Sequence, residues 1–349
     1  KLTDVYDREV LNFENDRGVK WFRPTEMLQL LEFKKENPQA KIVVGNTEVG
    51  VEVKFKHFEY KFLINPAQVK ELNAIEVTED GIKFGAAVTL SEIRDVLKKQ
   101  IEDLAEHETR IYRSIDVMLH WFAGMQVRNA ASIGGNIMTG SPISDLNPIL
   151  LAATASLEVE SIDGGRRIVK MDENFFTGYR RNVIRNDEVL ISVSIPKTTQ
   201  NQYFVAYKQA KRRDDDIAIV NAAFNIRLNR DLIEDARIAF GGMAPTTILA
   251  LKTAEMMRGK KWNNDLIEEV NNSLVNEIPL SADAPGGVIL YRRSLTLSLF
   301  FKAFLHISQE LEKSLNLNLI DERDRSGAEI FHALPPKSTQ LFEKVSSDQ

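Results

Sequence analysis

The sequence predicts an α+β fold with more than one lobe, and three observations lead to this prediction. The chain has 349 residues, which is long for a single hydrophobic core and favours two or three lobes. Near the start, a helix pattern and strand patterns follow one another closely, as in a small α/β lobe. From about residue 202 the pattern restarts as three strands followed by three helices, which is typical of an α+β lobe with its own sheet.

The composition excludes several classes of function. A net charge of −5 and a pI near 5.7 argue against a general nucleic-acid binder. The chain contains no cysteine, so it can hold no disulfide, zinc–thiolate site or iron–sulfur cluster of its own. The histidines are scattered without ligand spacing, and we therefore expect no metal site in this chain.

The chain has no predicted membrane span and no predicted signal peptide. Its most apolar stretch, around Leu295 to Ile307, is too short and is interrupted by Lys302. The chain opens on charged residues without a methionine and ends in a polar run. We expect a segment excised from a longer polypeptide.

The first lobe is expected at about 20–78, after an incoming linker over 1–19. Its predicted elements are a helix from Pro24 to about Asn37, a strand at 41–44, a turn at 45–48 and a second strand at 49–55. The helix should stop before Pro38, because the residue before a proline avoids the helical region. The second strand is predicted from the alternation of apolar and polar residues.

A larger lobe is expected at about 79–198. Thr89-Leu90-Ser91-Glu92 is a capping box, and a helix should run from it to about Lys99. Asp163-Gly164-Gly165 is a hairpin signal between two strands. The other predicted elements are helices at 115–124 and 148–155 and the hairpin strands at 157–161 and 166–170.

A third subdomain, with a three-stranded sheet and helices, is expected at 199–315. The predicted elements are antiparallel strands at 203–210, 218–228 and 232–240, then helices at 247–258, 263–277 and 288–313. Residues 316–349 have little periodicity and contain Pro335-Pro336, so we expect an exit linker there.

Residues 127–148 (VRNAASIGGNIMTGSPISDLNP) are mostly small or polar and predict neither a clear helix nor a clear strand. They contain a glycine-bearing turn at 132–136, and a second such turn lies at 42–49. Glycine lets a ligand approach the backbone, and successive N–H groups in such turns form anion-binding nests. Two nests on adjacent lobes would suit a long ligand with a diphosphate, and Asp145 would suit a ribityl or sugar hydroxyl or would cap the following helix.

Taken singly, each of these features has an ordinary explanation. A lone Gly-Gly-Asn or Gly-Asn is usually only a turn, paired aromatics on a helix usually pack in a core, and a charged run such as 211–216 is usually a solvated loop. The chain also lacks both the P-loop pattern and the Gly-x-Gly-x-x-Gly of Rossmann folds.

Together and in this order, the features resemble the FAD domains of the eukaryotic xanthine dehydrogenase/oxidase family, which are molybdenum hydroxylases. The resemblance covers about residues 20–313. It rests on the blocks at 43–50 (VVGNTEVG), 121–128 (WFAGMQVR), 131–137 (ASIGGNI) with 141–148 (SPISDLNP), 207–218 (YKQAKRRDDDIA) and 240–244 (FGGMA).

The resemblance implies an FAD-binding fold of the vanillyl-alcohol-oxidase (PCMH) type, with two α/β subdomains that hold FAD and a third packed beside them. It further implies that electrons from purine hydroxylation at molybdenum reach FAD through two [2Fe–2S] clusters, and that hydride then passes to NAD⁺. The clusters and the molybdopterin would belong to domains that flank this chain. The resemblance also implies a homodimer of the full enzyme and a cytoplasmic location, with peroxisomes as a second one.

The resemblance assigns site residues by position. The cofactor-binding residues it implies are Ile42, Val43, Val44, Gly45, Asn46, Thr47, Glu48, Val49, Phe122, Ser132, Gly134, Gly135, Asn136, Asp145, Leu190 and Lys208. Residues 42–49 should supply N–H groups to the diphosphate, residues 132–136 a second phosphate wall, and Phe122 a ring against the isoalloxazine. The NAD-side residues it implies are Glu48, Ser141, Tyr179, Asp215, Ile217 and Gly242. No side chain needs to be a catalytic acid or base, because the flavin performs the transfer and the protein's part is positioning.

Two alternatives remain at this point. Aldehyde oxidases are relatives that use O₂ and typically lack the acidic pattern of 214–216, whose negative charge should favour the cationic nicotinamide of NAD⁺. The second alternative is a scaffold that has lost its cofactor. The intact Gly45, Gly134, Gly135 and Asp145 argue against this alternative. Met138 and Gly140 depart from the usual residues of the family's phosphate loop. Because the chain has no thiol, we expect no disulfide-driven conversion to an oxidase through it.

Overall fold

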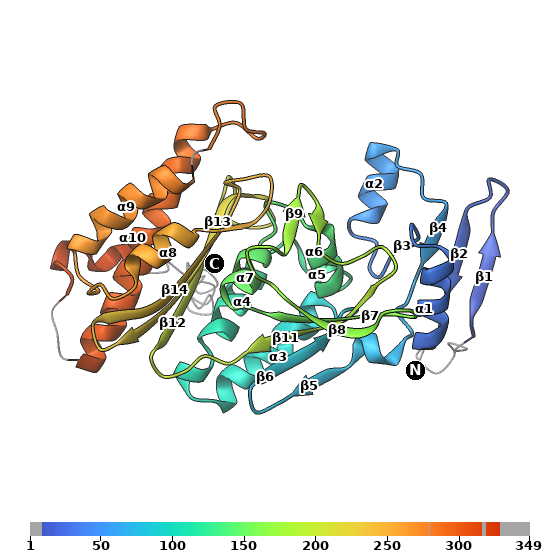
Figure 1. The fold of residues 1–349 in the computed structure, drawn as a ribbon, viewed down its shortest axis with the longest axis horizontal. Coiled ribbons are helices and arrows are strands. Elements are labelled where there is room, and N and C mark those ends of the chain that lie inside the picture. Colours follow the sequence, from blue (N-terminus) through green and yellow to red (C-terminus); the bar gives the residue numbers. More distant parts are fainter. Residues whose placement is uncertain (1–8, 279, 316–318, 329–349) are drawn as a thin grey trace, which may run out of the picture. The chain divides into compact units, whose positions relative to one another are not determined.

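The structure is a computed structural model that describes residues 9–278, 280–315 and 319–328. The chain divides into two compact units, Lys1–Phe301 and Lys302–Gln349, and every described strand belongs to the first (Figure 1). Among the described residues, no helix combines the length and the apolar character needed to cross a membrane.

The first sheet has the strand order β1-β2-β4-β3. Its elements are β1 (Leu11–Glu14), β2 (Lys20–Arg23), α1 (Met27–Glu36), β3 (Lys41–Ile42), α2 (Val49–Lys56) and β4 (Phe62–Ile64). β2 and β3 both run parallel to β4, while β1 is antiparallel to β2. β1 therefore places a strand inside the range expected to be the incoming linker; residues 1–8 of that range lie outside the described residues.

The predicted strand at 49–55 was wrong, because these residues form α2. Only Val49 and Glu52 are buried, whereas Phe55 on the same helix is 68% exposed. The reason is topological: β3 and β4 are parallel, and a parallel connection needs a crossover, which is usually a helix. The alternation of apolar residues is a local pattern that this tertiary requirement overrides.

The second sheet is antiparallel with the order β5-β6-β11-β7-β8. Its strands are β5 (Ile75–Val77), β6 (Gly81–Gly85), β7 (Ser156–Ser161), β8 (Gly165–Lys170) and β11 (Val189–Pro196). The predicted hairpin is confirmed as β7–β8. β5 belongs to this sheet although the 20–78 range would place it in the first lobe. A short pair, β9 (Phe176–Gly178) and β10 (Arg181–Asn182), precedes β11.

The helices of this lobe are α3 (Leu90–Asp103), α4 (Arg110–His120), α5 (Met125–Arg128), α6 (Ile133–Thr139) and α7 (Asn147–Ala152), with single 3₁₀ turns at Lys70–Asn73 and Glu106–Glu108. The capping box is confirmed, since the Thr89 side chain accepts from the Glu92 N–H and the Glu92 carboxylate from the Thr89 N–H. The helix predicted at 115–124 begins earlier and ends at His120, because Ala123 has a φ of +42° and leaves the helix.

The small-residue stretch is more regular than predicted, because it holds α5 and α6. Ser132 caps α6 by accepting the Gly135 N–H. Gly134 lets α6 pack closely, since a Cβ there would lie 2.6 Å from the Ala86 carbonyl oxygen.

The third sheet confirms the three predicted antiparallel strands and adds a fourth, with the order β12-β13-β14-β15. Its elements are β12 (Gln202–Ala210), β13 (Ala218–Asn229), β14 (Leu232–Gly241), β15 (Ile248–Leu249), α8 (Leu251–Met257), α9 (Asp265–Glu277) and α10 (Ile289–Leu315). β15 occupies the start of the helix predicted at 247–258.

One of the two inner strands of this sheet, β13, is covered on both faces (Figure 1). The Asn221 and Asn225 amides donate to Ser144 and Ala152 carbonyls at α7, while Phe224 packs its ring 6.1 Å from that of Phe300 on α10. Alternate residues of a strand point to opposite faces, so these two asparagines of β13 face the α7 side and Phe224 faces the α10 side.

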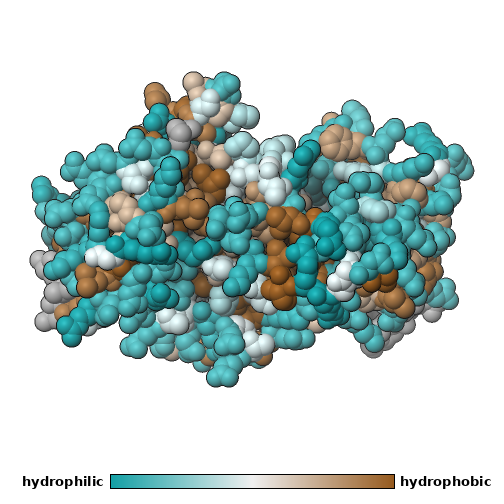
Figure 2. Space-filling view, viewed as in Figure 1, coloured by the Kyte–Doolittle hydropathy of each residue, from teal (hydrophilic) through white to brown (hydrophobic). Residues whose placement is uncertain are grey.

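In the second unit, the end of α10 is followed by the 3₁₀ helix Glu322–Ala328. The Glu312 carboxylate accepts from the N–H groups of Leu319 and Ile320 and pairs with Arg325 at 2.7 Å. Residues 316–318 and 329–349 of the predicted exit linker lie outside the described residues. On the face drawn in Figure 2, hydrophilic side chains dominate and hydrophobic ones form separate patches.

Candidate functional site

One cavity of about 980 Å³ collects segments that are far apart in the sequence, all within the first unit. This volume suits a large ligand. The predicted residues that line it are Ile42, Val43, Val44, Gly45, Asn46, Thr47, Glu48, Val49, Phe122, Ser132, Gly135, Asn136, Ser141, Asp145, Leu190, Asp215 and Ile217. The predicted residues outside the lining are Gly134, Tyr179, Lys208 and Gly242.

The loop between β3 and α2 is the wall with the strongest anion-binding character. Val43 is fixed by its N–H bond to the Ile64 carbonyl, and its own carbonyl accepts the Asn65 amide. The next five N–H groups, those of residues 44–48, have no hydrogen-bond partner among the described residues. The loop ends at the N-terminus of the eight-residue helix α2, where the helix dipole is positive. Successive unpaired N–H groups leading into a helix N-terminus suit a phosphate.

Gly45 ties this loop to the opposite wall. A Cβ at Gly45 would lie 1.7 Å from the carbonyl oxygen of Ala130, in the connection between α5 and α6. The glycine therefore allows two pieces of backbone to touch, and this contact holds the two walls of the cavity together.

The second wall, around the start of α6, differs from the expected phosphate nest. The N–H groups of residues 133–136 donate to Val88, Ala86, the Ser132 hydroxyl and the Ser132 carbonyl. This wall consequently presents side chains and packed backbone to the cavity rather than free N–H groups. The Asn136 side chain is itself held, since its Oδ1 accepts the Ser144 hydroxyl at 2.8 Å.

Asp145 and Lys208 form a buried ion pair beside the cavity. Their charged atoms are 2.6 Å apart and their side chains are 8% and 6% exposed. Burial raises the pKa of Asp145, and the Lys208 ammonium acts in the opposite direction. Lys208 also donates to the Trp121 carbonyl at 3.2 Å. Lys208 thus acts on the cavity through Asp145 and the backbone that precedes Phe122.

Charged side chains line the cavity next to α2. Arg180 lies 2.6 Å from the Glu48 carboxylate and 3.5 Å from that of Glu52. Glu52 accepts the Tyr60 hydroxyl at 2.6 Å; burial, and then this bond, raise the Tyr60 pKa. Lys41 pairs with Glu52 at 3.5 Å. The network links α2 to the β9–β10 turn.

The NAD-side residues are partly brought together. Ile217 is 69% exposed and Tyr179, beside Arg180, is 62% exposed, so both are accessible. Asp215 has a φ of +49°, and its carbonyl accepts from Arg212 at 2.6 Å. Gly242 has a φ of +82°, and a Cβ there would lie 2.3 Å from the Ile219 carbonyl oxygen. The backbone conformation and the close contact therefore require a glycine at position 242.

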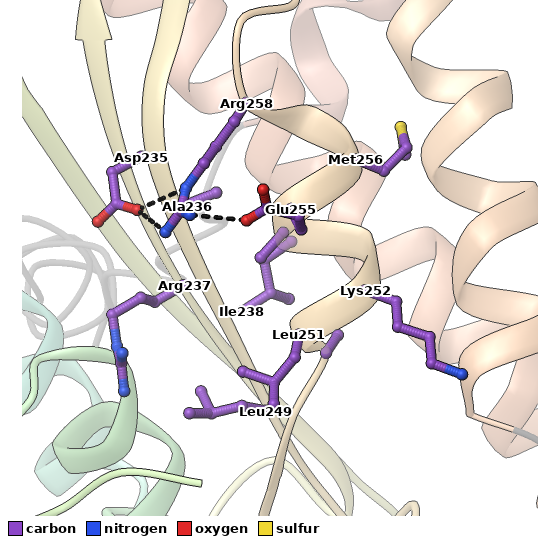
Figure 3. A pocket seen from close by; sticks show the side chains of 12 residues that line it. Asp235, Ala236, Arg237, Ile238, Leu249, Leu251, Lys252, Glu255, Met256 and Arg258 are labelled. Carbon is purple, nitrogen blue, oxygen red and sulfur yellow. Dashed lines mark hydrogen bonds and ion pairs between the residues drawn. The ribbon is translucent and has the colours of Figure 1, made fainter.

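A second cavity of about 670 Å³ lies between β14 and α8 (Figure 3). Arg258 there is paired with Asp235 at 2.7 Å and Glu255 at 2.6 Å. None of the predicted site residues lines it, so the first cavity is the candidate site.

Comparisons with known proteins agree with this geometry. Residues 13–198 match the family model described as the FAD binding domain in molybdopterin dehydrogenase. The chain belongs to this family. Residues 205–307 match the C-terminal domain of CO dehydrogenase flavoproteins, so this flavin domain carries both parts.

Relatives and solved structures extend the comparison of this molybdopterin dehydrogenase flavin domain. It is 53% identical to "Xanthine dehydrogenase" of Drosophila pseudoobscura pseudoobscura over all of this chain and 26% of the relative. It is 46% identical to "Xanthine dehydrogenase/oxidase" of Gallus gallus over 97% of this chain and 25% of the relative. The chain thus spans about a quarter of the length of these relatives. The carbon monoxide dehydrogenase structure from Hydrogenophaga pseudoflava shares its fold, with a TM-score of 0.70 and 19% identity over 88% of this chain and 97% of that one.

The FAD that the family name implies fits the residues present. The unpaired N–H groups of 44–48 suit its diphosphate, and the cavity size suits a dinucleotide. Phe122 and Leu190, at separate parts of the lining, offer apolar surface to flat rings.

Several lining residues were not predicted from the sequence, notably Lys34, Arg180 and Glu188. Lys34 is buried and donates to the carbonyls of Pro38 and Ala40 at 2.8 Å; burial lowers its pKa to about 8. Glu188 is held by Arg167 at 2.6 Å and by the Arg185 N–H. These residues lie in no recognisable motif, and only the packing of distant segments brings them to the cavity.

Proposed function

We propose that the chain binds FAD in the 980 Å³ cavity and passes electrons from FAD to NAD⁺ as the flavin-carrying segment of a xanthine dehydrogenase. The observation that carries the proposal is the run of five unpaired N–H groups that leads into α2 within this cavity. Such a run is the chemistry that a diphosphate requires, and a scaffold without a cofactor has no use for it.

The lining suggests how FAD would lie. The diphosphate would rest on the loop at 44–48, and the isoalloxazine would lie against Phe122, beyond the opposite wall. The Asp145 carboxylate, held by Lys208, would accept hydrogen bonds from the ribityl hydroxyls. The residues proposed for the cofactor and NAD sites are those named from the sequence, although Gly134, Tyr179, Lys208 and Gly242 lie outside the lining.

When bound, FAD supplies the hydride chemistry, and the protein positions the two ring systems. Asp215 and Asp216 both line the cavity and give it negative charge near the exposed Ile217. This charge favours approach of the cationic nicotinamide ring of NAD⁺. Glu48 also lines the cavity, and its pairing with Arg180 fixes its direction.

The role of the whole protein is part of the proposal, because the chain spans only 26% of its Drosophila relative. The name of that relative supports xanthine as the substrate of the full enzyme. In that enzyme a molybdopterin domain and an iron–sulfur domain would flank this chain. The homodimer and the cytoplasmic location rest on the family resemblance alone. The relatives' names do not favour the aldehyde oxidase alternative.

The test is the visible absorption spectrum of the purified chain, followed by addition of NADH without oxygen. We expect a flavin band with one FAD per chain, which bleaches on addition of NADH. A flavin band that ignores NADH would contradict the NAD⁺ part and favour an oxidase. A folded chain that neither contains nor takes up FAD would contradict the FAD site itself.

A further inference from the structure

The turn that carries Phe122 follows the end of α4, and its carbonyl groups are held by two cations. Lys208 donates to the carbonyl of Trp121 at 3.2 Å. Arg128 donates to the carbonyls of Phe122 and Ala123, each at 2.6 Å. Three successive carbonyl oxygens at a helix C-terminus are thus capped by positive charge, where the helix dipole favours it.

Ala123 adopts a strained backbone conformation, so the turn that contains it needs interactions to hold it in place. Its φ of +42° is in the left-handed region, which disfavours residues with a Cβ. Arg128 bonds to the carbonyls on both sides of the Ala123 N–Cα unit, that is, to Phe122 and to Ala123 itself. These two bonds hold the peptide groups on both sides of the Ala123 Cα, and so the backbone from which the Phe122 ring projects.

Arg128 is tied to the same turn by its own backbone. Its N–H, like that of Val127, donates to the Gly124 carbonyl at 3.1 Å. Side chain and backbone of Arg128 therefore close a compact loop from 122 to 128 that needs no distant partner. Among the described residues, Arg128 makes no ion pair with a carboxylate, so its charge is directed to the two carbonyls.

Nearby charged groups do not compete with the two carbonyls for the Arg128 side chain. Burial, and then the neighbouring Arg94, lower the pKa of Arg128, while Asp215 acts in the opposite direction. Arg94 is itself engaged, at 2.7 Å from Asp116 and 3.1 Å from the His120 ring nitrogen Nδ1.

We propose that Arg128 is a positioning residue for the flavin reaction, because it locks the strained Phe122–Ala123 turn and so sets the angle and distance of the Phe122 ring at the isoalloxazine. The proposal rests on the proposed function, since it takes Phe122 to face FAD. It predicts that Arg128 affects how FAD sits and reacts, while the loop at 44–48 decides how tightly FAD binds.

The test uses the purified full chain with Arg128→Met, Arg128→Lys and Ala123→Gly, singly, and Ala123→Gly/Arg128→Met combined. For Arg128→Met we expect unchanged FAD content, an altered circular dichroism of the visible flavin band, and flavin reduction by saturating NADH slowed about tenfold or more. The NADH concentration for half-saturation should change little. Both carbonyls accept from the same nitrogen, Arg128 Nη1, so Arg128→Lys, which also ends in one donor nitrogen but on a shorter side chain, should lie between wild type and Arg128→Met.

Glycine at position 123 supplies a test of the strain argument. Ala123→Gly alone should have little effect, because glycine adopts a positive φ without strain. Combined with Arg128→Met it should restore part of the reduction rate. Arg94→Gln is the control for charge, since Arg94 acts on Arg128 through its field but bonds to neither carbonyl. It should leave the flavin dichroism unchanged.

Other results would overturn the proposal. Unchanged dichroism and rate in Arg128→Met would do so, and so would loss of FAD from a folded Arg128→Met chain, which would make Arg128 a binding residue. If Arg128→Met does not fold, Arg128→Lys decides by the same readouts, with an expected slowing of about threefold. If the wild-type chain takes up no FAD, the proposed function fails. Tryptophan fluorescence, to which Trp121 contributes, would then still show whether Arg128 holds the turn.

Discussion

Gly45 lines the cavity, as the sequence predicted, but for a different reason from the one that the sequence suggested. The sequence suggested that this glycine lets a ligand approach the backbone. In the structure the missing side chain makes room for the Ala130 carbonyl instead, at 1.7 Å from an added Cβ. The close approach is between two walls of the protein, and the ligand benefits because those walls form the cavity.

Gly45→Ala should therefore damage both stability and FAD binding. The new methyl group must push apart two backbone segments, which we expect to cost about 2 kcal/mol or more and to weaken FAD binding more than tenfold. Thermal unfolding and FAD titration would measure both. Gly178→Ala is the control, since its Cβ would meet nothing closer than the Arg181 side chain at 4.0 Å. Equal effects of the two substitutions would refute the packing argument.

At Lys208 the prediction concerns pH. Lys208→Met leaves the Asp145 carboxyl buried without its partner, which should cost about 3–5 kcal/mol at neutral pH. Burial already raises the Asp145 pKa and Lys208 opposes this, so the substitution raises that pKa further. The folded variant then keeps a proton that the unfolded chain releases, and its free energy of unfolding should fall as the pH rises from about 4 to 7.

Urea unfolding of the FAD-free chain at several pH values would measure this slope. Lys208→Met/Asp145→Asn serves as the control, because it has no carboxyl at position 145 to titrate. The double variant should recover part of the lost stability and show a smaller slope. An identical slope in both variants would mean that Asp145 is not the group responsible.

At the scale of elements, local patterns succeeded where local interactions decide the structure. The capping box at Thr89 and the hairpin at Asp163-Gly164-Gly165 were predicted correctly, because their hydrogen bonds join residues close in the chain. α2 was predicted as a strand, because the requirement for a crossover between parallel strands is not written into residues 49–55.

The link between α2 and the β9–β10 turn can be tested at Arg180. Arg180→Gln removes the ion pairs with Glu48 and Glu52, which we expect to be worth about 1 kcal/mol, or roughly fivefold in FAD affinity. Amide hydrogens of residues 50–56, which are hydrogen-bonded within α2, should exchange faster. Arg181→Gln is the matched control, since this neighbouring arginine is exposed and has no ion pair among the described residues. Slower or unchanged exchange in Arg180→Gln would contradict the link.

At the scale of the whole molecule, one cluster of buried rings in the described part of the chain stabilises the fold without belonging to the cavity. Phe224 is fully buried on the α10 side of β13, among the rings of Tyr207, Phe240 and Phe300. On the other side, the Asn225 amide reaches the end of α7 and the Asn221 amide reaches Ser144, just before it. The ring cluster therefore supports the fold without lining the cavity.

Phe224→Ala should lower the free energy of unfolding by about 3–5 kcal/mol through the cavity it creates. FAD affinity of the folded fraction should stay within about twofold of wild type, because Phe224 lies outside the lining. Phe55→Ala, at a side chain that is 68% exposed, should change stability by less than about 0.5 kcal/mol. If the free energy of FAD binding fell by as much as the free energy of unfolding, the ring cluster would be shown to support the cavity as well as the fold.

The sequence by itself determined the α+β class, most helices, a minority of the strands, and the family, because periodicity, capping residues and ordered motifs are properties of neighbouring residues. Most of the residues that it named through that family resemblance line the cavity, but they make up fewer than half of the lining. Only the tertiary structure decided that 49–55 is a crossover helix, that Gly45 meets Ala130, that Arg180 pairs with Glu48 and that Arg128 bonds to the Phe122 carbonyl. These outcomes depend on contacts between segments or on backbone torsions, which the linear sequence does not specify.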